Sequence, residues 1–197
     1  MANILQSLQR TIIAAFVLLL LVILIETSVS GNAIAFSHAW GSFAMRWLHV
    51  ISGVMWIGLL WYFNFVQIPS MPQIPDEQKP AVSKVIAPRA LFWFRYAALA
   101  TVITGLLVAW MQGYIAQALT LQHGVVAIGL GMWIALLMAF NVWFIIWPNQ
   151  KKALGIVVVE AAEKAQAARM AMLTSRFNTM LSITMLYMMV AQQNGGL

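Results

Sequence analysis

The feature that most constrains this chain is a series of long apolar runs with almost no charge inside them. Each run is close to the roughly 20 residues that an α-helix needs to cross the hydrocarbon core of a bilayer. The runs are continuous rather than alternating, and a helix satisfies its backbone hydrogen bonds internally, as lipid requires. The sequence therefore predicts an all-α, polytopic transmembrane helical bundle with about five spans. These spans are predicted at residues 11–29, 43–68, 91–112, 123–147 and 172–191.

The composition excludes other classes of protein. Hydrophobic residues make up 62% of the 197 residues and charged residues only 8%, whereas soluble domains have about 25% charged residues. So few charges cannot cover the surface of a soluble enzyme, and so apolar a chain is not disordered. The sequence has 0 cysteines. This excludes disulfides, iron–sulfur clusters and a covalent c-type haem.

The positions of Lys and Arg predict the orientation of the bundle. All of the 11 basic residues except Arg46 lie before the first run, or in and beside the connections after the second and fourth runs. Basic residues mark the cytoplasmic side of a bacterial inner membrane. We therefore expect a multi-pass inner-membrane protein with a cytoplasmic N-terminus and a C-terminus outside. The charge is a topology signal rather than a nucleic-acid site, and it suits a partner surface of anionic membrane lipid.

Two connections on the cytoplasmic side differ in character. Residues 69–90 carry all of the 6 prolines except Pro148, and this predicts an extended Pro-rich loop. Residues 151–171 place apolar side chains at helical spacing, and this predicts an amphipathic helix that continues into the last span. No internal repeat divides the chain, so we expect one transmembrane domain over residues 1–197.

Polar residues inside apolar helices usually face the interior of a bundle, because they are costly in lipid. The second run holds a stripe of them within about one quarter of the helix circumference. The stripe consists of Arg46, His49, Gly53, Trp56, Asn64 and Gln67. In the fourth run, His123 and Asn141 share a face in the same way. Both helices thus carry an imidazole toward the outside and an amide toward the cytoplasm.

The predicted topology brings all 3 histidines to the outer side. Two imidazoles on facing helices are a common way to hold haem b, so His49 and His123 are the candidate ligands. Arg46 is placed to pair with a propionate, Gly53 allows close approach of the macrocycle, and Trp56 lines the site. Copper or another metal held by His49, His123 and His38 is the alternative cofactor. The structural alternatives are histidine as a hydrogen-bonding anchor and glycine as a helix-packing residue.

Two stretches carry a resemblance to a known family. These are RWLHVISGVMWIGLLWYFNFVQIP at residues 46–69 and FNVWFIIWPNQKK at residues 140–152, with APRALFWFRYAALATVITGLL between them. Together they resemble the urate oxidase N-terminal domain family, the membrane portion of bacterial membrane-bound urate hydroxylases. The first stretch also resembles copper-resistance membrane proteins and b-type cytochrome subunits. The family resemblance implies a helical domain that works with a cytochrome c module. This chain has no cysteine for such a module, so a separate periplasmic cytochrome c is the expected partner.

Three functions follow as hypotheses. The leading one is a small inner-membrane redox protein or subunit that holds haem b or a metal near the outer leaflet. The second is a non-catalytic accessory subunit, packed against other membrane subunits of a respiratory or oxidase complex or against a second copy of itself. The third is a transporter of copper or a small solute, in which the polar stripe of the second run lines a wet path.

Overall fold

The computed structural model describes residues 2–196, and every regular element in that part of the chain is a helix. The chain divides into two compact units, one up to Trp40 and one from Gly41 onward. The first unit contains α1 (Ala2–Leu5) and α2 (Leu8–Ser30). α2 buries none of its side chains. Gly31, in the left-handed conformation at φ 70°, ends this helix, as glycine commonly does.

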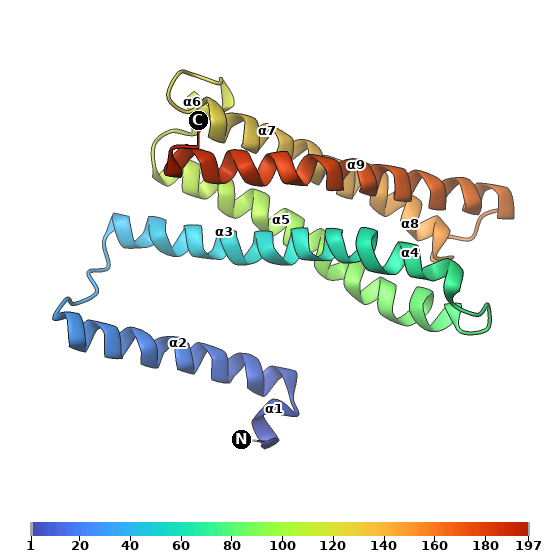
Figure 1. Cartoon of the computed structure of the whole chain (residues 1–197), viewed down its shortest axis with the longest axis horizontal. Coiled ribbons are helices and arrows are strands. Elements are labelled where there is room, and N and C mark those ends of the chain that lie inside the picture. Colours follow the sequence, from blue (N-terminus) through green and yellow to red (C-terminus); the bar gives the residue numbers. More distant parts are fainter. Residues whose placement is uncertain (1, 197) are drawn as a thin grey trace. The chain divides into compact units, whose positions relative to one another are not determined.

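The second unit is a bundle of four long helical rods (Figure 1). The first rod is α3 (His38–Trp61), η1 (Tyr62–Gln67), α4 (Ile68–Ser70) and η2 (Met71–Gln73). The second is η3 (Ala81–Ile86) with α5 (Ala87–Met111), and the third is α7 (Val126–Phe140), η4 (Asn141–Ile146) and α8 (Trp147–Ala153). The fourth is α9 (Ala161–Asn194), and the short helix α6 (Ile115–Leu119) lies between the second and third rods in the chain.

Among residues 2–196, four helices are long and apolar enough to cross a membrane. They cover Leu8–Ser30, His38–Gln73, Ala81–Met111 and Val126–Ala153, so each contains most of a predicted span. The predicted fifth span, 172–191, lies within α9, which is long enough at 34 residues but less apolar. The physical reason is that α9 carries buried Ser175, Asn178 and Ser182 on its inner face.

Three of the prolines inside the rods, Pro69, Pro88 and Pro148, each follow a π-helical turn. Proline has no N–H and its ring collides with the carbonyl four residues earlier. A π turn avoids this conflict by bonding to the carbonyl five residues earlier. In each case the residue just before the proline makes such a bond: Ile68 N–H to Phe63 O, Ala87 N–H to Val82 O, and Trp147 N–H to Val142 O.

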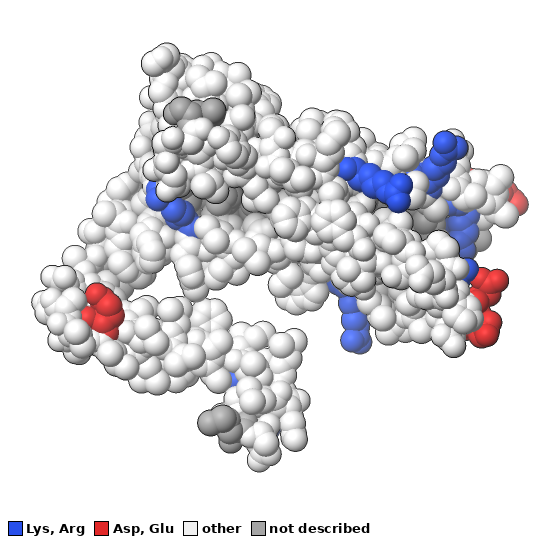
Figure 2. Space-filling view, in the orientation of Figure 1, with Lys and Arg blue, Asp and Glu red and all other residues white. Residues whose placement is uncertain are grey.

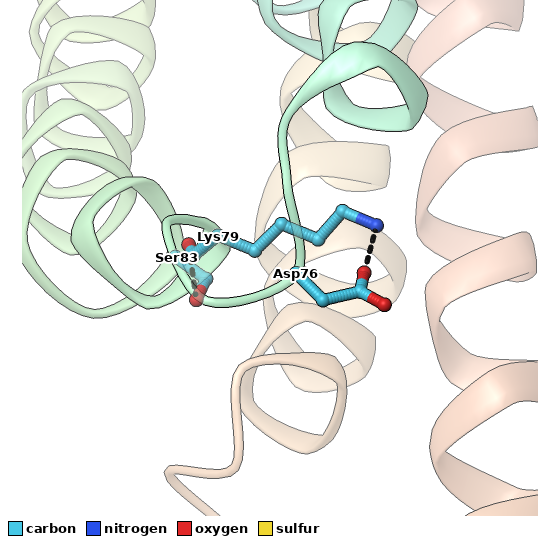
Figure 3. Close-up of polar contacts among 3 residues, drawn as sticks. All are labelled: Asp76, Lys79 and Ser83. Atoms are coloured by element: carbon cyan, nitrogen blue, oxygen red, sulfur yellow. Dashed lines mark hydrogen bonds and ion pairs between the residues drawn. The ribbon is translucent and has the colours of Figure 1, made fainter.

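The prediction of a Pro-rich loop over 69–90 is therefore wrong in its extent. Helical structure continues to Gln73 and resumes at residues 79–80, directly before η3, so only residues 74–78 are not helical. Across this connection Lys79 Nζ lies 2.6 Å from Asp76 Oδ1, and the Ser83 hydroxyl donates to the Lys79 carbonyl (Figure 3). The Lys79 hydrogen bond holds the pKa of Asp76 below its ordinary value.

The predicted amphipathic helix over 151–171 is also corrected by the structure. Residues 151–153 end α8, residues 154–160 are not helical, and α9 begins at Ala161. The interruption falls at Gly155, whose φ of 74° is a left-handed conformation that glycine adopts without strain. Its neighbours include β-branched Ile156, Val157 and Val158, which favour helix weakly.

The core joins all four rods. The largest fully buried side chains include Trp56 and Leu60 from α3, Phe94 from α5, and Met138 from α7. Below them, amides and hydroxyls of α9 bond across to α3, η1 and η4. Asn64 Nδ2 donates to Ser175 Oγ at 2.8 Å, Asn141 Nδ2 donates to Asn178 Oδ1 at 2.8 Å, and Trp61 Nε1 donates to Ser182 Oγ at 3.0 Å. These residues are called the polar belt below. Polar side chains of α9 thus bond between helices.

The predicted number of spans gives a test of topology. Five crossings place the two termini on opposite sides of the membrane. We expect alkaline phosphatase joined after the C-terminus to be active, and the same reporter joined after Val157 to be inactive. A green fluorescent protein fusion supplies the complementary signal. Fluorescence from the C-terminal fusion would show that α9 stays on the cytoplasmic side.

The polar belt gives a test of stability. Asn178 is fully buried and its Nδ2 also donates to the Met138 carbonyl at 2.9 Å. Asn178→Ala removes the bond from the Asn141 Nδ2 donor and the bond to the Met138 carbonyl, so we expect it to lower the free energy of unfolding by about 1–2 kcal/mol. Denaturant titration of the purified protein in micelles measures this change. Thr184→Ala, at an exposed position of the same helix, is the matched control and should change it by less than about 0.5 kcal/mol.

Candidate functional site

A cavity of about 590 Å³ opens between α3, α5, α7 and α9 in the second unit. Its volume is within the range of about 300–1,000 Å³ that small-molecule and cofactor sites occupy. Four of the five residues predicted to bind a cofactor line it: Arg46, His49, Gly53 and Trp56. They lie at helical spacing on one face of α3, which is why the stripe that the sequence shows becomes a cavity wall.

His49 is held in this wall by α5. Its Nδ1 lies 2.9 Å from the Thr101 carbonyl oxygen and 3.3 Å from Thr104 Oγ1. A carbonyl only accepts, so the short bond requires the proton on Nδ1 and leaves Nε2 as the nitrogen with a lone pair. This arrangement is typical of metal-ligating histidines, whose second nitrogen is fixed by a backbone carbonyl.

Glycine at position 105 makes room for this imidazole. A Cβ added to Gly105 would lie 2.8 Å from His49 Cε1 and 3.1 Å from His49 Nδ1. The other helix-packing glycines are also filled by protein atoms: a Cβ at Gly129 would meet the Ala118 carbonyl, and one at Gly131 would meet Met188 and Met189. Gly53 differs, because its nearest neighbour is Thr101 Cγ2 at 3.9 Å and it lines the cavity. Gly53 therefore suits the predicted close approach of a ligand, as does Gly58, which also lines the cavity and where an added Cβ meets nothing within 4 Å.

The cavity is polar at one end and apolar along its body. The polar end contains Arg46, Tyr114, Gln193 and Asn194, and Arg46 Nη1 donates to Gln193 Oε1 at 3.2 Å. Arg46 Nε is buried and makes no hydrogen bond within residues 2–196. Burial raises the pKa of Tyr114, an effect that nearby Arg46 partly offsets, so its phenol stays protonated at neutral pH. This end can therefore receive an anion.

The apolar body is lined by aliphatic side chains and by three methionines. They are Ile57, Val108, Ile128, Met132, Met185 and Met189. The same three methionines and His49 also line a small adjoining cavity of about 40 Å³. Trp56 is fully buried, and its Nε1 has no partner among the described residues. The cavity therefore combines one imidazole, thioether sulfurs, and two buried donors that a ligand could satisfy.

The structure does not bring His123 to this cavity, which contradicts the prediction that His49 and His123 bridge one ligand. His123 is exposed in the connection before α7, which begins at Val126 rather than at 123. The helix begins late because Gly124 adopts φ 87°, outside helical geometry. The adjoining Gly124 carbonyl accepts a bond from Gln192 Nε2 at 2.7 Å, which fixes this connection to the end of α9.

His38 is the first residue of α3 and belongs to the first unit, as does Glu26 in α2. Within residues 2–196, no group of three or more His, Cys, Asp or Glu side chains is close enough to hold a metal ion. The predicted metal site at His49, His123 and His38 spans both units and stays a prediction. A haem site, with one imidazole and a thioether, does not need such a group.

Sequence reasoning missed Tyr114 and the methionines as cavity residues. Tyr114 follows Gly113, whose φ of 76° turns the chain back over the end of α5. No periodic pattern of residues predicts such a turn. Met132 lies four residues, about one turn, after Ile128 on the inner face of α7, and this spacing was a usable signal. Trp133, the next residue of α7, is half exposed, and its Nε1 donates to the Leu119 carbonyl.

Comparison with family models, with curated proteins and with solved structures found no match for this chain.

The contact between Gly105 and His49 gives a direct test of the site. Gly105→Ala places a methyl group against the imidazole and should displace it from the Thr101 carbonyl, at a cost of about 1–3 kcal/mol in unfolding free energy. Thermal unfolding in micelles measures this. Gly58→Ala is the matched control, because Gly58 also lines the cavity and a Cβ there meets nothing within 4 Å. Equal effects of the two substitutions would contradict the packing of His49 against α5.

Proposed function

We propose that the protein is a bacterial inner-membrane redox subunit that binds haem b in the cavity between α3, α5, α7 and α9. The observation that carries the proposal is the bond from His49 Nδ1 to the Thr101 carbonyl, which leaves Nε2 for the iron. The four long apolar helices support the membrane location, and in the proposed topology α9 would be the fifth span.

The residues of the cavity fit the chemistry of haem b. His49 and one of the thioethers of Met132, Met185 and Met189 would hold the haem iron, and a pair of His and Met ligands would raise its reduction potential. Arg46, with its unpartnered Nε, would pair with propionate. Trp56 and the aliphatic lining exclude water from the macrocycle face. When bound, haem b supplies one-electron transfer.

Partner and substrate rest on the family resemblance of residues 46–152. It leads us to propose a separate periplasmic cytochrome c as the electron partner and an oxidation resembling that of urate hydroxylases as the wider reaction. The chain itself contributes the imidazole, the guanidinium and the apolar enclosure.

Two other functions make different demands on the same residues. A non-catalytic accessory subunit needs the polar belt as a link between helices but has no need for the cavity. A transporter of copper or a small solute needs the stripe of α3 to stay wet along its length. The structure has Asn64 buried and bonded to Ser175 and to the Leu60 carbonyl, so the inner half of the stripe is packed. The cavity therefore favours the redox function.

Visible absorbance tests the proposal. The protein purified from haem-supplied cells should show a Soret band with about one haem per chain, and His49→Ala should weaken haem binding at least about tenfold. His123→Ala is the matched control, and it should leave the spectrum unchanged because His123 is outside the cavity. A colourless wild-type protein that also fails to take up added haem would exclude the cofactor. Loss of assembly with His49→Ala, without any spectrum in the wild type, would favour the accessory subunit.

A further inference from the structure

The basic residues of the second unit gather toward the end where α8 finishes and α9 begins (Figure 2). Most of them are exposed, but Arg95 in α5 is only 9% exposed. Its guanidinium lies over the Trp147 ring, with Cζ 3.3 Å from the ring centroid. Lys151 Nζ lies 5.7 Å from the centroid of the same ring. Two cations thus converge on one indole, far along the bundle from the cavity that contains His49.

Neither of these cations has a carboxylate partner within the described residues. The ion pairs in that part of the chain join Lys79 to Asp76 and Lys152 to Glu163. Arg95 Nε and Nη1 are buried and donate to nothing within residues 2–196. A buried guanidinium without an anion is costly, because its desolvation is not compensated. Stacking on tryptophan offsets only part of this cost.

A third unpartnered donor belongs to the same cluster. Trp143 Nε1 is buried without a hydrogen bond in the described chain. Its ring packs edge-on against Tyr96, the neighbour of Arg95, at 5.7 Å between centroids. Gln150 Oε1 is also unpartnered and buried, but a neutral amide oxygen does not balance two positive charges. The cluster therefore presents three donors and a net positive charge, which suit a phosphate.

Aromatic rings place the cluster at the level of lipid headgroups. Phe92 packs against Trp93 and Tyr96, and Tyr96 against Trp143, in a continuous row of rings. Exposed Trp and Tyr side chains of membrane helices concentrate at the membrane–water interface. Trp93 is 57% exposed and Tyr96 is 47% exposed, so these rings face the surroundings of the bundle rather than its core.

We propose that Arg95, Lys151, Trp143 and Trp147 form a binding site for the phosphate of an anionic phospholipid. The Arg95 guanidinium and the Lys151 ammonium attract the phosphate, and the acyl chains lie against the apolar surface of α5. Basic pockets between membrane helices on the cytoplasmic side recognise such headgroups. The site does not depend on the proposed haem function.

Retention of lipid by the full-length protein tests this proposal. In mixed micelles of phosphatidylglycerol and phosphatidylcholine, native mass spectrometry should show about tenfold preferential retention of phosphatidylglycerol by the wild type. Arg95→Gln should abolish that preference, while Arg95→Lys should keep part of it. The matched control is Lys152→Gln, which removes a cation already paired with Glu163 and should leave the preference unchanged.

Three results would overturn the proposal. They are equal retention of the two lipids by the wild type, an undiminished preference in Arg95→Gln, and displacement of phosphatidylglycerol by millimolar inorganic phosphate, which would mean a site for free phosphate. Circular dichroism checks that Arg95→Gln is folded. If it is not, Lys151→Gln replaces it in the test, with an expected loss of about threefold in preference and the same overturning result.

Discussion

The rods depend on a constraint of backbone chemistry: an apolar solvent demands that every helical carbonyl find an internal donor, and proline removes one. Pro69, Pro88 and Pro148 each occur inside a rod and follow a π turn that restores a bond five residues back. A π turn also rotates the residues after it relative to those before. Because Asn64 and Asn141 lie within two of these turns, the adjustment for proline also orients the amides that α9 binds.

This constraint explains which parts of the fold could be predicted from the sequence. Apolar length locates the rods, since burial in lipid needs little else, and helical spacing correctly gathers Arg46, His49, Gly53 and Trp56 on one face of α3. The error over residues 69–90 arose because proline usually ends a helix. A π turn depends on the solvent and on the neighbours of the whole backbone segment. No residue type near Pro69 or Pro88 predicts it.

The candidate site could also be predicted only in part from the sequence. The imidazole of His49 was predictable, but its orientation was not, because it depends on the absence of a side chain at Gly105, 56 positions along the chain, and on a carbonyl of Thr101. His123 failed as its partner for a local reason. A single glycine at 124 delays the start of α7, and a prediction based on helical periodicity assumed that the helix already included 123. It is thus easier to predict which residues share a face of one helix than which residues of two helices lie opposite each other.

The two ends of the bundle hold cations in opposite circumstances. Arg46 shares a cavity with Tyr114 and Gln193 and can meet a ligand there, whereas Arg95 is pressed against Trp147 at the aromatic row. Between them, Leu60, Asn64, Met138 and Asn178 fill the interior, all at 8% exposure or less. A packed centre prevents a ligand from passing from one end to the other. A ligand of the cavity therefore enters and leaves through the end that carries Arg46, and the site proposed at Arg95 is separate from it.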